Sequence, residues 1–430
     1  MHELSQMIKD DMKPALGVTE PGAIAFAVAK ARSFTKGDIK KVNVAMNSGM
    51  YKNAFTCGIP NSNEVGNVFA AALGVVAGNA DKGLESLADV TPEDNVKAQE
   101  MIDQGKVTVE LSGITSRIFI EATVETEEDK AIVTIRDSHT NITKITVNDK
   151  VELETEDEKK TEEDGGEEEA HSIHKYTLQQ LYDYVTTVDI EEIRFINEAY
   201  KVNLELFHEG LENPRTTFAR QLLAINNGKE VSDDEQKTAS LMCNAAIEAR
   251  VIGLDKPAMS ITGSGAHGII ATMPLYAAYK VNGYTEEQLL RATALSYLVC
   301  MYIKEYSGRL SAFCGCAIAA GSGMACALVY LRGGTVEMMA HTLNNMASSI
   351  TGMICDGGNQ GCTMKGVAAV DAAYKSVEFA MNGIYISEVH GINGNTPEET
   401  MRNMGLIASP GMVGTEKTIV EIFEDKLKNN

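Results

Sequence analysis

The pattern of hydrophobic and polar positions changes near residue 176, from a mixture of strand and helix to helix alone. Apolar and polar residues alternate at 39–46, which predicts a half-buried strand. Four more strand-like runs follow, and the connections between them are too short for helical crossovers. They predict a mainly antiparallel sheet, with strands at 107–111, 118–124, 131–136 and 142–147.

Helix starts and apolar faces mark the rest of the chain. Thr19 and Thr91 each offer a capping hydroxyl, with an acidic residue and a proline in the turn that follows. Beyond 176, the apolar faces of successive helices need one another for burial, which predicts a single helical domain. Its expected helices lie at 178–185, 190–209, 216–226, 233–250, 285–305, 310–332, 336–350, 366–381 and 397–406.

These patterns together predict an α+β fold with two domains. Residues 1–175 form a mixed α/β domain with a mainly antiparallel sheet, and residues 176–430 form an all-α helical domain. The acidic run at 152–169 has too few apolar residues to fold, so we expect a flexible connection without a chemical role. A small-molecule site is expected between the two domains.

Charge and composition narrow the possible partners and location. The formal net charge is −22, which would repel a polyanion, so we expect no nucleic-acid partner. No run of 18 residues is apolar enough to span a membrane, and the polar N-terminal segment does not resemble a signal peptide. The sequence therefore predicts a cytoplasmic protein that does not bind membranes.

The eight cysteines are the first indication of chemistry. Five of them fall between 314 and 362, and in a long chain without a secretion signal such clustering favours metal binding or catalysis over disulfides. Cys355 and Cys362 flank a loop with three glycines, and Cys314 or Cys316 could add a third thiolate. A cubane held by three cysteines leaves one iron open as a Lewis acid. The spacing alone supports metal binding only weakly and leaves packing or redox roles open, since it fits no common zinc or ferredoxin pattern.

Three further segments contain candidate site residues. Residues 263–268 (GSGAHG) match a dinucleotide-binding pattern, but we expect no strand before them, so their role is either carboxylate binding at a helix start or an ordinary turn. His139 lies in a predicted hairpin turn and could also carry a proton. Lys52 and Asn53 offer a cation and an amide, although a solvated surface lysine is the simpler interpretation of Lys52.

Several long motifs, in the same order, resemble one family over nearly the whole chain. It is the L-cysteine desulfidase family, which is related to the iron–sulfur-dependent L-serine dehydratases. The motifs are KPALGVTEP (13–21), MYKN (50–53), AAALGVVAGNA (70–80), HTNI (139–142), GSGAHGIIATMP (263–274), RLSAFC (309–314) and GMICDGGNQGCTMK (352–365).

The resemblance implies an oxygen-sensitive [4Fe-4S] lyase that acts on a small L-amino acid. The family releases sulfide and ammonia from L-cysteine and leaves pyruvate, and relatives release water and ammonia from L-serine. The family's cluster ligands correspond to Cys314, Cys355 and Cys362, carried by the all-α domain. We expect catalytic roles for Lys52, His139 and Glu20, substrate contacts from Asn53, Thr140, Asn141, Ser264 and His267, and assembly into a homo-oligomer.

One position departs from the family pattern. The family has a functional cysteine directly before Thr-Glu-Pro, and this chain has Val18 there. Valine can neither bind iron nor move a proton. L-cysteine stays the expected substrate, and Val18 opens three alternatives: another substrate such as L-serine, a replacement thiol such as Cys57, or amino-acid binding without turnover. A metal-free helical protein is the remaining alternative.

Overall fold

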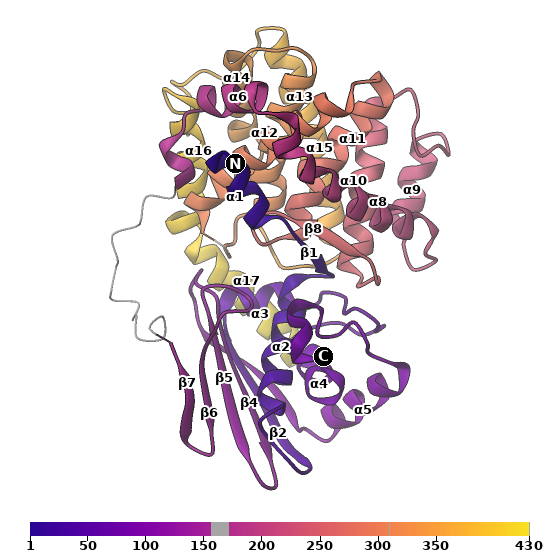
Figure 1. Cartoon of the computed structure of the whole chain (residues 1–430), viewed down its shortest axis with the longest axis vertical. Coiled ribbons are helices and arrows are strands. Elements are labelled where there is room, and N and C mark those ends of the chain that lie inside the picture. Colours follow the sequence, from indigo (N-terminus) through magenta and orange to yellow (C-terminus); the bar gives the residue numbers. More distant parts are fainter. Residues whose placement is uncertain (156–171, 309, 430) are drawn as a thin grey trace.

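A computed structural model describes residues 1–155, 172–308 and 310–429. Its six-stranded sheet has the order β3–β2–β4–β5–β6–β7, and only the β2–β3 pair is parallel (Figure 1). The predicted α+β fold with a mainly antiparallel sheet is confirmed. The strands are β2 (Ile39–Asn47), β3 (Val107–Gly113), β4 (Phe119–Thr126), β5 (Lys130–Arg136), β6 (Ile142–Val147) and β7 (Lys150–Glu154).

Alternation along the strands decides which face of the sheet is covered. Val42 and Val44 of β2 lie opposite Val124 and Ala122 of β4, and all four side chains are fully buried. The helices α2 (Thr19–Arg32) and α4 (Asn67–Ala77) pack together and cover this face. Their close approach requires Gly74, because a Cβ there would lie 2.8 Å from the Ala25 backbone. Thr91 caps α5 (Pro92–Asp103) in a capping box, as its sequence predicts.

The helical region packs around α12 (Glu286–Ser307), most of which is buried. Its other helices are α6 (Leu178–Thr187), α7 (Ile190–Ile193), α8 (Asn197–Glu212), α9 (Phe218–Ile225), α10 (Glu235–Val251), α11 (Gly265–Asn282), α13 (Gly321–Leu331), α14 (Val336–Ile350), α15 (Gly361–Met381) and α16 (Pro397–Leu406). The 3-10 turn η4 (Arg194–Ile196) separates α7 from α8, so the single helix predicted at 190–209 is wrong.

The helix predicted at 310–332 is wrong at its start. Phe313 forms an isolated β-bridge with Ile354, and the Cys314 amide donates to the Met353 carbonyl at 3.0 Å. These contacts keep residues 310–314 out of a helix, and helical structure starts only at Gly315, just before the π-helical turn η5 (Cys316–Ala320). Pairing across distant segments has overridden local helical pattern here, and it brings the cysteine segments together.

Four elements without a sequence prediction join the two regions. Strands β1 (Lys13–Leu16) and β8 (Pro257–Ser260) pair antiparallel, so a strand does precede the 263–268 motif, contrary to our expectation. A βαβ unit is nevertheless absent from this described segment, because that pairing is antiparallel. Figure 1 shows α1 (Glu3–Asp11) among the helices and α17 (Val413–Asn429) beside α3 (Ser48–Ala54), at the sheet.

The boundary near 175 stays a prediction, although these crossings show that each region also uses chain from the other half. The acidic run begins inside β7, at residue 152, and its part from 156 to 169 lies outside the described residues. None of the described helices combines the length and hydropathy that a membrane span needs.

Candidate active site

One cavity collects most of the predicted site residues. It offers about 80 Å³ of free space, which suits a small molecule better than a nucleotide or peptide. Its walls come from the start of α2, from α3, from the start of α11, and from the two cysteine segments. Chain from both halves of the sequence is therefore needed to enclose it, in line with the expected site between two regions.

Thiols form one wall of the cavity. Cys316, Cys355 and Cys362 line it, whereas Cys314 is buried behind them and is hydrogen-bonded to Cys316. The Cys355 amide donates to the Ala312 carbonyl at 2.6 Å, which fixes one cysteine segment on the other. Cys362 follows at the start of α15, with its thiol 3.4 Å from the Gly357 carbonyl.

Ordinary thiol chemistry is suppressed at this wall. Burial, followed by the neighbouring Cys355, raises the pKa of Cys362 to about 11 despite the positive charge of Lys365. The hydrogen bond with Cys316 and burial raise the pKa of Cys314 well above its ordinary range. These thiols therefore stay protonated at neutral pH unless a bound metal displaces their protons.

An acid and an imidazole also line the cavity. Glu20 Oε1 accepts a hydrogen bond from Asn53 Nδ2 at 2.9 Å and lies 3.7 Å from His139 Nε2. Burial alone would raise the pKa of Glu20, but the contacts with His139 and Asn53 and the charge of Arg250 outweigh it and hold the pKa at about 2. Glu20 is therefore a carboxylate at physiological pH.

The start of α11 forms a third wall. Ser264 and His267 line the cavity, and His267 Nδ1 contacts the Thr262 hydroxyl. Because that hydroxyl donates to the Ile261 carbonyl at 2.8 Å, we assign the Nδ1 proton to the bond with Thr262, which leaves Nε2 as an acceptor. Burial and the charges of Lys304 and Arg250 lower the pKa of His267 to about 3, so the ring is neutral.

The Cys314–Gly315–Cys316 sequence makes room for that ring. A Cβ on Gly315 would lie 2.7 Å from His267 Nε2 and 3.0 Å from Lys304 Cδ. Any larger residue between the two cysteines would displace the imidazole, so the glycine joins the thiol wall to the α11 wall.

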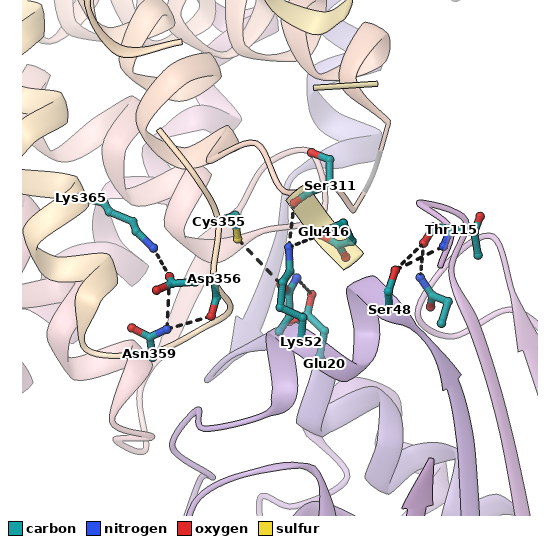
Figure 2. Close-up of polar contacts among 12 residues, drawn as sticks. Glu20, Ser48, Lys52, Thr115, Ser311, Cys355, Asp356, Asn359, Lys365 and Glu416 are labelled. Carbon is teal, nitrogen blue, oxygen red and sulfur yellow. Dashed lines mark hydrogen bonds and ion pairs between the residues drawn. The ribbon is translucent and has the colours of Figure 1, made fainter. Parts of the chain in front are cut away.

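Lys52 has a different environment from the one its sequence suggests. It is 1% exposed, which makes the surface interpretation wrong. Its ammonium bonds to the Ser311 carbonyl at 2.9 Å and to Glu416 of α17 at 2.8 Å, and it does not line the cavity (Figure 2). Burial would lower its pKa, but the charges of Cys355 and Glu416 prevail and raise it. A paired ammonium of this kind is poorly suited to act as a base, and its catalytic role stays a prediction.

Two predicted substrate contacts and one replacement thiol lie off the cavity wall. Thr140 is exposed, and the Asn141 amide donates to the Arg136 carbonyl at 3.1 Å, as a hairpin turn requires. Cys57 is fully buried, and its thiol lies 3.4 Å from the Ala54 carbonyl. None of these three side chains lines the cavity, so their proposed roles have no support from its geometry.

Comparison with known proteins places this site in a family. The family model described as "Serine dehydratase alpha chain" matches residues 81–421. The chain belongs to the serine dehydratase alpha chain family. It is also 40% identical over 424 residues to a UPF0597 protein of Clostridium botulinum, with 98% of each chain covered. UPF0597 proteins of Caldanaerobacter subterraneus and Bacteroides fragilis are 37% and 33% identical, with at least 98% of each chain covered. The family resemblance stated from the sequence motifs is confirmed, and with it a lyase-type family.

The sequence motifs of this serine dehydratase family member imply a [4Fe-4S] cluster, which needs thiolate donors. In residues 1–155, 172–308 and 310–429, no three or more His, Cys, Asp or Glu side chains converge as they would around a single metal ion. A cubane makes a different demand, because each thiolate binds a separate iron. Cys355, Cys362 and one thiol of the Cys314–Cys316 pair can supply the separate thiolates that such a cluster needs. Lys304 and Lys365 lie close enough to interact with their charge.

Glycines shape the loop that would cradle such a group. Gly357 has a φ of +100°, and a Cβ there would lie 2.4 Å from the Lys52 carbonyl oxygen. At Gly358 a Cβ would lie 2.7 Å from Val18 Cγ1. The loop is therefore pressed against α3 and against position 18. Asp356 anchors its other side through an ion pair with Lys365 (Figure 2). Val18 thus stands at the cavity wall, beside the cysteine loop, where the family's thiol would stand.

Sequence reasoning missed several cavity residues. Arg250, Thr262, Lys304 and Ser311 all line it. The Arg250 and Lys304 positions look like ordinary basic residues in the last turns of α10 and α12, where a helix dipole favours cations. Only the three-dimensional packing, which leaves Arg250 4% exposed, indicates a different role.

Proposed function

We propose that the protein is a [4Fe-4S]-dependent lyase that eliminates the β-substituent of a small L-amino acid. One observation carries the proposal: three thiols, the Glu20–His139 pair and the neutral ring of His267 line one small cavity. Membership of the serine dehydratase alpha chain family supports the lyase class. The substrate and the cluster are parts of the proposal.

Cys355, Cys362 and one thiol of the Cys314–Cys316 pair would hold the cluster. Cys314 is the ligand that the family motif implies, and Cys316 is the one that lines the cavity. When bound through three cysteines, the cluster supplies an open iron that polarises the leaving group. Lys304 and Lys365 offset negative charge at this wall, and the glycine loop lets the backbone approach closely.

Glu20 and His139 are the candidates for proton handling. Glu20 stays ionised, is fixed by Asn53, and can orient and stabilise a protonated His139 across 3.7 Å. His139 is 8% exposed, so its proton exchange is shielded from bulk water. It would take the α-proton as the β-substituent leaves, and Lys52 would position α3 through its bonds to Ser311 and Glu416.

L-cysteine is the first candidate substrate. Loss of the α-proton and of the Cβ–S bond releases H₂S and leaves an enamine, which takes up water and yields pyruvate and ammonia. One cysteine and one water thus give one pyruvate, one ammonia and one H₂S. The reaction needs no oxidant or reductant.

L-serine is the second candidate, and Val18 favours it. With valine against Gly358, the wall beside the cysteine loop is apolar where the family has a thiol. Loss of water from serine followed by hydrolysis of the enamine gives pyruvate and ammonia. Val18→Cys should raise sulfide release from L-cysteine if the missing thiol limits that reaction. Unchanged release in Val18→Cys would mean that the cavity is suited to serine.

Anaerobic purification tests the proposal most directly. We expect a brown protein with broad visible absorbance that makes pyruvate from L-serine or L-cysteine and loses activity in air. A colourless, metal-free protein would contradict the cluster. A coloured protein that binds amino acid without forming pyruvate would instead be a sensor or binding protein.

A further inference from the structure

Arg250 is a buried cation that makes no ion pair in the part of the chain that the structure describes, and the charge of Glu20 acts on it only at longer range. It lies in the last turn of α10, lines the cavity and is 4% exposed. Its Nε has no hydrogen-bond partner, and no described carboxylate lies within ion-pair distance of its guanidinium. An unpaired buried charge costs several kcal/mol, so a position like this calls for an anionic ligand.

The guanidinium lies at the N-terminus of α11. A Cβ on Gly265, the first residue of that helix, would lie 2.7 Å from Arg250 Nε and 2.8 Å from the Ala258 Cβ. The first amides of a helix have no partner within the helix, and the Ser264 side chain does not cap them. A fixed positive charge and a set of free helix amides therefore face the same small space, which is the chemistry of a carboxylate site.

We infer that Arg250 and the N-terminus of α11 bind the α-carboxylate of the amino-acid substrate. The inference rests on the proposed function and gives the substrate an orientation. The carboxylate lies at α11 and the β-substituent at the thiol wall. Glu20, an anion that interacts electrostatically with Arg250, supplies the opposite charge that a zwitterionic substrate needs for its ammonium group.

The rival explanation is that Arg250 only balances the charge of a cluster on the thiol wall. The two explanations differ in the ligand they require. A carboxylate site distinguishes an amino acid from its uncharged amide, whereas a counter-ion to the cluster affects cluster stability and leaves that distinction unchanged.

The test uses the anaerobically purified holoenzyme and measures binding by titration calorimetry. The probes are L-alanine, which has no leaving group, and L-alaninamide, which lacks the carboxylate. The wild-type protein should bind L-alanine at least about 30-fold more tightly than L-alaninamide, and Arg250→Gln should abolish that preference. Arg250→Lys keeps the charge but loses the two-pronged geometry, so it should retain part of the preference. If Arg250→Gln does not fold, the binding of both probes is measured with Arg250→Lys.

Arg215→Gln is the matched control, because Arg215 is exposed and bonds to the Ile252 carbonyl outside this cavity. It should bind both probes as the wild type does. An equal preference in wild type and Arg250→Gln would overturn the inference, as would a loss of visible absorbance without a change in preference. A preference that depends on Arg250, in a protein that forms no pyruvate, would uphold the carboxylate site and refute the proposed lyase.

Discussion

The helices α11 and α15 both open on the cavity, and each has a short glycine-containing sequence at its start: α11 begins with GAHG (265–268), whereas GNQG (358–361) ends at the first residue of α15. Their first turns nevertheless differ in how the amides are satisfied. At α15 the Gly361 amide donates to Asn359 Oδ1 at 2.7 Å, and the Cys362 amide donates to the Asn359 carbonyl at 2.9 Å. At α11 the residue before the helix, Ser264, makes no capping bond.

Because of this difference, the two helix starts can bind different groups. The α15 start is closed on itself and presents a thiol, so it can hold a ligand through Cys362 but offers no free amides of its first two residues. The α11 start is open and has the unpaired Arg250 beside it. Glycine pattern alone therefore does not specify whether a helix start binds an anion, since the preceding side chain decides whether the amides are available.

The largest effect should follow from removing a thiol at the α15 side. Cys355→Ala or Cys362→Ala should abolish cluster assembly, because each removes one of the three proposed ligands and the remaining thiols, at Cys314 and Cys316, belong to the other cysteine segment. Iron content and visible absorbance after anaerobic reconstitution measure this. Cys326→Ala, a buried cysteine of α13 away from the cavity, is the control and should retain the cluster. Ser264→Ala on the α11 side should retain it too, and a cubane in Cys362→Ala would sink the assignment.

The next largest difference should come from adding a methyl group at a glycine near the start of each helix. A Cβ on Gly268 would lie 1.8 Å from the Met259 carbonyl oxygen, and backbone cannot move aside easily. Gly268→Ala should therefore lower the free energy of unfolding by about 3 kcal/mol. Gly361→Ala meets only the Asn359 side-chain oxygen, at 2.7 Å, and gains helix propensity, so it should cost less than about 1 kcal/mol. Chemical denaturation compares the two, and equal costs would contradict the close packing of α11 on β8.

A pH titration probes the charge of Glu20, which lines the same cavity as the start of α11. The pKa of Glu20 is held at about 2, below its ordinary value of 4.5, so its ionised form stabilises the folded state. That contribution, on the order of 3 kcal/mol, is present above pH 4.5 and is lost as the pH falls towards 2. Glu20→Gln should flatten the pH dependence of unfolding in this range, whereas Glu93→Gln, at an exposed helix turn, should not. A slope in Glu20→Gln as steep as in wild type would show that Glu20 is not the stabilising acid.

The smallest effect should come from the caps themselves. Asn359→Ala removes the bond to the Gly361 amide and should cost about 1 kcal/mol in the free energy of unfolding. Ser264→Ala removes no capping bond and should change it by no more than about 0.5 kcal/mol. If Ser264→Ala were the more costly of the two, the α11 start would be closed and the contrast between the helices would fail.

Local patterns in the sequence predicted the fold well where the secondary structure of an element depends on its own residues. Alternation located the strands at 107–147, and the predicted helices at 336–350 and 397–406 have the observed bounds. Prediction failed where the secondary structure of a segment depends on pairing with a segment distant in the sequence. Residues 310–314 carry an apolar helical pattern, yet the bridge from Phe313 to Ile354 keeps them out of a helix. Strands β1 and β8 are short, and only their mutual pairing makes them strands.

The same reasoning applies to the site. Cysteine and glycine spacing indicated the loop from 355 to 362, because those residue types are uncommon together. The Glu20–His139 contact joins two turns with no shared pattern, and a capping interpretation fully explained Glu20 in the sequence. Lys52 read as a surface residue because its partner, Glu416, lies in a helix that the hydrophobic pattern did not indicate. The homo-oligomer and the cytoplasmic location stay predictions.

The bond from Lys52 to Glu416 joins residues 364 positions apart. Contacts over such sequence separations form late, because closing a long loop costs entropy before it is rewarded. A nascent chain has no ion-pair partner for Lys52 until α17 has been synthesised, although the Ser311 carbonyl is available earlier. We therefore expect maturation to have an order in time, in which polypeptide synthesis and docking of α17 come first and delivery of iron and sulfide to the thiol wall comes after.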